Sequence, residues 1–154
     1  MTQAQANSSS FDNILDSTLD DLADMPSIQL FPAGAHKVKV EFKVNREKKS
    51  IQVCMVYVDV LELADPTATA PAPGDKNSVF LNMINKDGSA NEYSQGALKL
   101  MLQSLKAGGF DGANSGEIME AAKDAEVAVV TKIRLGKGEY LGRDNLDIVK
   151  MEVI

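Results

Sequence analysis

Apolar and polar side chains alternate between His36 and Arg46, and this pattern constrains the fold most. Valines and one phenylalanine occupy alternate positions, and mainly lysines lie between them. A period of two residues is typical of a β-strand with one buried face and one face in water. The next apolar run, Ile51 to Leu63, is long and rich in valine, which favours a central strand or one that curls between two layers.

Further sequence patterns indicate the elements that follow these two strands. Residues 64–78 form a proline-rich stretch, which indicates an extended surface loop. Apolar residues alternate with polar ones up to Ile148, and the alternation shifts by one residue at Val149, which predicts a β-bulge. The expected elements after the loop are a strand over 79–84, a helix over 92–107 closed by two glycines, a short helix over 116–123 capped by Ser115, and strands over 126–135 and 146–154.

The order strand, strand, strand, helix, strand, strand is that of the OB-fold, a curled five-stranded barrel with a helix between its third and fourth strands. We therefore expect a mainly β (β+α) fold with an OB-like barrel over residues 28–154. A chain of 154 residues is long enough for one such domain with its own core. Residues 1–27 are expected to form a flexible acidic N-terminal arm.

The charge is distributed unevenly between arm and body. The chain carries a net charge of −6, and residues 1–34 contain five aspartates with no lysine or arginine. Removing these five from the 22 acidic residues leaves 17 in the body, against 16 lysines and arginines. Local patches therefore matter more than the total charge. Apolar residues near helical spacing from Phe11 to Met25 indicate a frayed helix on the domain, a docking peptide, or an intramolecular mimic of a phosphate backbone.

No pattern typical of an enzyme or a metal centre is present. The single cysteine, Cys54, lies in an apolar run and the single histidine is His36, so a zinc site within one chain is not expected. The sequence contains no P-loop, and its one Gly-x-Gly lies between two strands. We therefore expect a non-enzymatic protein without cofactor. The lone cysteine and the absence of a secretory signal or apolar span predict a cytoplasmic protein without a membrane segment.

Basic and aromatic residues on the expected strands are the remaining candidates for function. Repeated cations suit a strand of phosphates, and exposed rings suit the stacking of bases. The loop between the first two strands and the loop between the fourth and fifth strands flank the usual binding face of an OB-fold. The basic residues of the first hairpin and those of the last hairpin form two basic sets, which are therefore expected to border one groove. The candidate DNA-binding residues are Lys37, Lys39, Lys43, Arg46, Lys48, Tyr57, Phe80, Lys132, Arg134, Lys137, Tyr140 and Arg143.

Structural alternatives stay open for several of these residues. Tyr57 and Phe80 suit the core as well as a stacking role, whereas Tyr140 stands between cations on a glycine-rich hairpin. The lysine row of the first strand suits an ordinary solvated face as well as a binding strip, and lysine at a sheet edge also prevents aggregation.

The chain resembles phage-encoded single-stranded DNA-binding proteins of the OB-fold type over residues 28–154. The resemblance lies in F-P-A-G-A-H-K-V-K-V, in V-C-M-V-Y-V-D-V-L-E-L, in the helix E-Y-S-Q-G-A-L-K-L-M-L-Q-S-L-K, and in V-V-T-K-I-R-L-G-K-G-E-Y-L-G-R-D-N-L-D-I-V. It implies a protein that coats single strands during phage DNA replication or recombination, in the host cytoplasm and without a cofactor. Proteins of this type often carry an acidic tail at the C-terminus, whereas here the acidic segment lies at the N-terminus.

The leading hypothesis is therefore a single-stranded DNA-binding protein whose acidic arm contacts replication or recombination proteins. The sequence leaves open whether the chain forms a homo-oligomer. The alternative is a viral protein–protein adaptor or structural component without nucleic-acid binding, which the overall acidity and the proline-rich loop favour.

Overall fold

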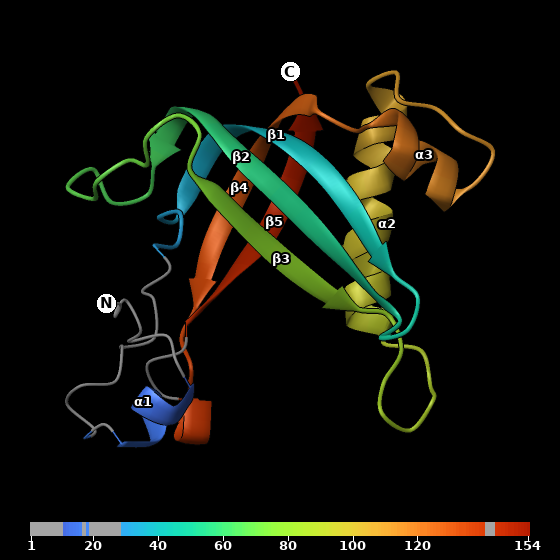
Figure 1. The fold of residues 1–154 in the computed structure, drawn as a ribbon. Helices are drawn as coiled ribbons and strands as arrows, with labels where there is room; N and C mark the ends of the chain where they lie inside the picture. The colour runs from blue at the N-terminus through green and yellow to red at the C-terminus, as the bar shows by residue number, and fades with distance from the viewer. Residues whose placement is uncertain (1–10, 17, 19–28, 141–143) are drawn as a thin grey trace, which may run out of the picture.

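The computed structural model describes residues 11–16, 18, 29–140 and 144–154. Within these residues, five strands form one antiparallel sheet in the order β3-β2-β1-β4-β5 (Figure 1). The expected mainly β class is confirmed. The elements are α1 (Phe11–Asp16), β1 (Gly34–Asn45), β2 (Ser50–Leu63), β3 (Lys76–Asn82), α2 (Glu92–Ala107), α3 (Ser115–Ala121), β4 (Ala125–Arg134), a 3-10 turn (Gly138–Tyr140) and β5 (Asn145–Val153).

The core lies between the inner face of the curled sheet and the two helices α2 and α3. Alternate residues of each strand point inward, as Val38, Val53 and Val127 do, all of them fully buried. The apolar stripe of α2 covers them, with Leu105 completely buried. Figure 1 shows β1, β2 and β3 crossing in front of β4 and β5, with α2 beside the sheet. Burial of apolar surface along these strands and the helix stripe therefore stabilises the fold.

A buried polar network fixes the segment that enters β1. Phe31 is buried, and its ring meets that of Tyr57 edge to face with 5.1 Å between centroids. His36 Nε2 lies 2.7 Å from the carbonyl oxygen of Pro32, and its Nδ1 lies 2.8 Å from the Tyr57 hydroxyl oxygen. Because a carbonyl oxygen can only accept, Nε2 donates to Pro32. Burial lowers the pKa of His36 and so favours the neutral imidazole, in which Nδ1 accepts from the Tyr57 hydroxyl.

The sheet is not closed into a barrel. β3 and β5 are its two edges, and no backbone pairing joins them among the described residues. The entering chain lies beside β3, because Asn77 Oδ1 accepts a hydrogen bond from the Phe31 N–H at 2.9 Å and Asn77 Nδ2 donates to the Gln29 carbonyl at 3.1 Å. Through these two hydrogen bonds the Asn77 side chain holds residues 29–31 against β3, the edge at which the expected barrel would have closed.

Most expected elements are present, with three corrections of detail. The predicted bulge is confirmed, since Val130 pairs with Lys150 and Thr131 with Ile148, so that Val149 is the extra residue. Helix α3 is capped by Asn114 and not by Ser115, because the Asn114 side chain accepts from Glu117 N–H. The strand expected over 79–84 runs from Lys76 to Asn82. The strand expected over 126–135 ends at Arg134, so that Leu135 lies beyond β4 and is 67% exposed.

The acidic arm is described only in part. The helix expected from Phe11 to Met25 is present over Phe11–Asp16, with Asp12, Leu15 and Asp16 exposed. The apolar positions of this segment beyond residue 18 lie outside the described residues. No helix in the described part of the chain is long and apolar enough to cross a lipid bilayer.

Candidate nucleic-acid interface

The outer face of β1, β2 and β3 carries side chains in register across the three strands. Alternation places every second residue on this face, away from the core. Cys54 lies here, half-buried, between Glu41 of β1 and Ser78 of β3. The two neighbouring rows, each from β1 through β2 to β3, are Lys43–Gln52–Phe80 and Lys39–Val56–Lys76. The sheet therefore mixes cations, amides and one exposed ring on a single surface.

A basic groove, which we call the hairpin groove, runs from the β1–β2 turn to β3. Its volume is about 750 Å³. Lys43, Arg46 and Lys48 form no ion pair with any described residue, so their charges are available to a ligand. The turn is held by the Asn45 side chain, which accepts from Lys48 N–H at 2.9 Å. The lining residues are Lys43, Val44, Asn45, Arg46, Glu47, Lys48, Ser50, Gln52, Phe80 and Asn82.

A second groove lies between the two open edges of the sheet, and we call it the β3–β5 groove. Its volume is about 1060 Å³, and residues of β3, of the start of β5 and of the first turn of α2 line it. Phe80 and Tyr93 offer exposed rings here, with 66% and 77% of each residue accessible. Gln52, Phe80 and Asn82 line both grooves, so the two grooves adjoin at these residues.

The β3–β5 groove carries charges of both signs. Lys76 and Arg134 contribute the cations, and Asp144 and Asp147 contribute the carboxylates. The Arg134 guanidinium lies 3.6 Å from a carboxylate oxygen of Asp147. One oxygen of Asp144 accepts from the backbone N–H of Gly136 at 3.1 Å. This groove is therefore electrically balanced, in contrast with the hairpin groove.

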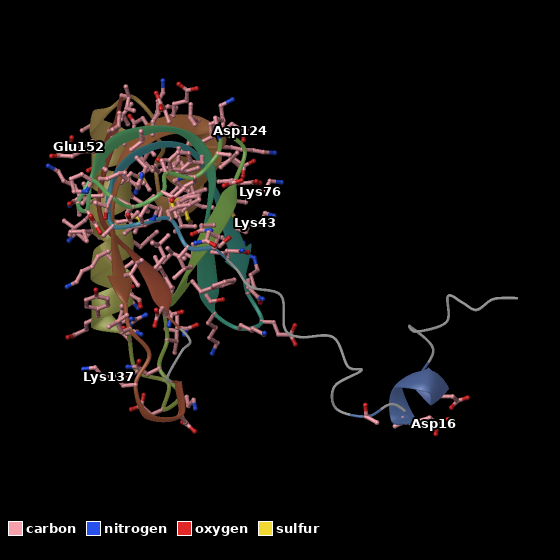
Figure 2. All side chains as sticks on the ribbon, turned by 90° about the vertical axis from the view of Figure 1, so that its left-hand side faces the viewer. Asp16, Lys43, Lys76, Asp124, Lys137 and Glu152 are labelled. Carbon is pink, nitrogen blue, oxygen red and sulfur yellow. The ribbon has the colours of Figure 1, made fainter. Side chains whose placement is uncertain are left out.

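The remaining predicted cations lie elsewhere. Lys37 forms an ion pair of 3.3 Å with Glu126, whereas Lys39, Lys132 and Lys137 are exposed and line neither groove. Figure 2 shows Lys43 and Lys76 on the same side of the molecule, with Lys137 at the tip of the β4–β5 connection. The two basic sets were expected to border one groove, but the described cations line different grooves: Lys43, Arg46 and Lys48 line the hairpin groove, and Arg134 lines the β3–β5 groove.

The predicted aromatic residues have different positions. Phe80 lies on the outer face, but Tyr57 is only 2% exposed, so its predicted stacking role is wrong and the core alternative holds. Tyr57 occupies one of the inward-facing positions of β2, where its hydroxyl contacts His36, and this position keeps the ring in the core. Burial first, and then the Asp59 carboxylate, raise the pKa of Tyr57. The Tyr140 side chain and Arg143 lie outside the described residues.

Sequence reasoning missed several lining residues, of which Tyr93 is the most informative. Tyr93 lies in the first turn of α2, five positions before Leu98. At 3.6 residues per turn this is about 140° around the helix from Leu98, away from the buried stripe. An aromatic residue off the apolar stripe of a helix was the available signal. The other missed residues of the β3–β5 groove that carry charge or a carboxamide are Gln29, Gln52, Lys76, Asn77, Asn82, Asn91, Asp144, Asn145 and Asp147.

The described residues contain no group of three or more His, Cys, Asp or Glu side chains that could hold a metal ion. The grooves instead offer cations, carboxamides and flat rings, which suit reversible binding of a charged, ring-bearing polymer. No protein-family model matches the sequence, and no curated protein sequence matches it either.

Proposed function

We propose that this protein binds single-stranded DNA along the hairpin groove and the β3–β5 groove. The observation that carries the proposal is that the two grooves meet at Phe80, an exposed ring that lines both of them, while three unpaired cations line the hairpin groove. The strand order also supports it. Apart from the missing β3–β5 pairing it is that of an OB-fold, whose strand 2–3 face and loops bind oligonucleotides. We therefore regard the fold as a partly open OB-like sheet.

In this proposal phosphates and bases occupy different parts of the path. Lys43, Arg46 and Lys48 neutralise phosphates and release counterions, which contributes affinity without reading sequence. Phe80 and Tyr93 stack on bases, each stacked base contributing about 1–3 kcal/mol. The strand thus runs from the first hairpin toward the start of β5.

The biological role that fits such a path is the coating of single strands during phage DNA replication or recombination, without catalysis and without a cofactor. The acidic N-terminal segment then serves as a contact for replication or recombination proteins. The resemblance of residues 28–154 to phage single-stranded DNA-binding proteins supports this role.

Fluorescence anisotropy with a labelled mixed-sequence DNA single strand tests the proposal. We expect binding that weakens steeply as salt rises, with a slope of about 0.7 per neutralised phosphate. The variant Lys43→Ala/Arg46→Ala/Lys48→Ala is expected to lose at least about tenfold in affinity and to lower the slope by about two.

The matched control is Lys99→Ala/Lys106→Ala/Lys123→Ala, which removes the same charge from exposed positions outside both grooves. An equal loss in this control contradicts a defined path. Tighter binding of the equivalent RNA contradicts the assignment to DNA. Absence of binding at low salt contradicts the proposal as a whole and leaves the adaptor hypothesis.

A further inference from the structure

The two grooves differ in charge, and this difference separates the sites for phosphate and for base. Three cations and one carboxylate, Glu47, line the hairpin groove. In the β3–β5 groove the two cations face two carboxylates, Asp144 and Asp147, and one of the cations is already paired. A phosphate placed beside those carboxylates is repelled, so the polymer backbone is favoured in the hairpin groove.

The β3–β5 groove has hydrogen-bond acceptors in the same lining as its two rings. Asp144 uses one of its oxygens for the Gly136 N–H, which leaves the other available. Asp147 is held by Arg134 at 3.6 Å, beyond the usual length of a strong charge-assisted hydrogen bond. Asn82 and Asn145 form no side-chain hydrogen bond within the described residues. The groove thus combines flat exposed rings with carboxylate and carboxamide oxygens that are not fully used within the described residues.

Resting on the proposed function, we propose that the β3–β5 groove selects bases that carry amino groups, guanine above all. An ionised carboxylate can only accept hydrogen bonds. Guanine presents two parallel donors, N1–H and the N2 amine, to one carboxylate, and cytosine and adenine each present one amine. Thymine and uracil offer a single N3–H between two carbonyl oxygens, which the carboxylates of Asp144 and Asp147 repel. A ring stacked on Phe80 or Tyr93 is therefore bound best when its edge donates.

The test compares three DNA oligonucleotides of about 12 nucleotides, a length that suits one OB-fold site. One contains only thymidine, the second carries isolated guanines among the thymidines, and the third replaces those guanines by hypoxanthine, which lacks the N2 amine. Anisotropy titrations of the full chain at low salt are expected to give about tenfold tighter binding for the guanine strand than for the thymidine strand. The hypoxanthine strand is expected to lie between them.

Variants then assign the preference to the two carboxylates. Asp144→Asn/Asp147→Asn keeps the shape but replaces acceptors by amides that also donate, and it is expected to reduce the guanine preference to about twofold or less. Asp111→Asn is the matched control, because Asp111 also forms an ion pair of 3.6 Å, with Lys106, but lies outside the groove. It should leave the preference unchanged.

The outcomes separate this inference from the proposed function. Equal affinity for all three strands overturns the base preference while leaving single-strand binding intact. A guanine preference that survives Asp144→Asn/Asp147→Asn also overturns it. Failure of every strand to bind at low salt overturns the proposed function itself.

Discussion

Phe80 is exposed although its neighbours in β3 are buried. Val79 and Leu81 point into the core, and the alternation of the strand turns the intervening ring outward. A single exposed apolar side chain is ordinary on a protein surface, but this ring lines both grooves, where the proposed path places a base. The adjacent Gln52 donates to the Ser78 hydroxyl at 2.9 Å and occupies the next strand of the same surface.

The substitution Phe80→Ala is expected to weaken single-strand binding by about 1–3 kcal/mol, because one stacked base loses its ring. The free energy of unfolding should change by less than about 1 kcal/mol, since most of the ring is already in water. Anisotropy and urea denaturation measure the two quantities. Phe80→Tyr keeps the flat ring and should bind nearly as the wild type does. Unchanged affinity of Phe80→Ala at low salt would contradict a stacking role.

At the scale of the elements, β1 joins the two halves of the sheet. Its first half, from Gly34 to Val40, pairs with both β2 and β4, whereas its second half extends with β2 alone. The extension ends in the first hairpin, where Val44 is exposed and its partner Ile51 on β2 is buried. Gly34 starts the strand with φ of +149°, and a Cβ there would overlap the carbonyl oxygen of Glu62 on β2.

Gly34→Ala is therefore expected to destabilise the fold by about 1–3 kcal/mol or more, through backbone strain and the overlap with β2. Gly96→Ala is the matched control, because Gly96 is exposed on α2 and a Cβ there meets nothing within 4 Å. This control should gain about 0.5–1 kcal/mol, since glycine weakens a helix interior. Urea denaturation of the two variants measures both effects, and equal stabilities would show that Gly34 is not constrained.

The elements could be predicted from the sequence because each has its own local pattern. The alternation that begins at His36 identified β1 as a strand, and the apolar stripe identified α2 as a helix. The shift of the alternation at Val149 located the bulge. The closure of the sheet and the interface depend on contacts between distant segments. Asn77 holds Gln29 and Phe31 across 48 and 46 positions of the chain, and no local pattern reports such a bond. The sequence pattern around Tyr57 fits a surface position as well as a core position. Only the contact with His36 in the folded protein shows that the ring lies in the core.

For the molecule as a whole, His36 links stability to pH. Burial lowers its pKa below the ordinary value of 6.5, and the hydrogen bond to Pro32 opposes this shift only in part. As the pH falls below 6.5, the unfolded chain takes up a proton that folded His36 does not. The free energy of unfolding therefore decreases on acidification, by at most about 1.4 kcal/mol per pH unit for this group.

Urea denaturation at neutral pH and at a pH about one unit below the ordinary histidine pKa checks this expectation. The wild type should lose stability between the two conditions, and His36→Gln should lose less, although it starts from a lower stability. The comparison is made within each protein, so the cost of the substitution itself cancels. An identical pH effect in both proteins would exclude His36 as the source.

The half-buried thiol of Cys54 lies one register row from Phe80, and it is the only thiol in the chain. A maleimide dye attached there would place one fluorophore per molecule beside the path assigned to the polymer, and its emission would report occupancy directly. The reactivity of this thiol also has a drawback. Oxidation that couples two molecules through this sulfur would press their outer faces together and shield Phe80 from solvent, so a preparation kept without reductant should lose binding in proportion to its covalent dimer.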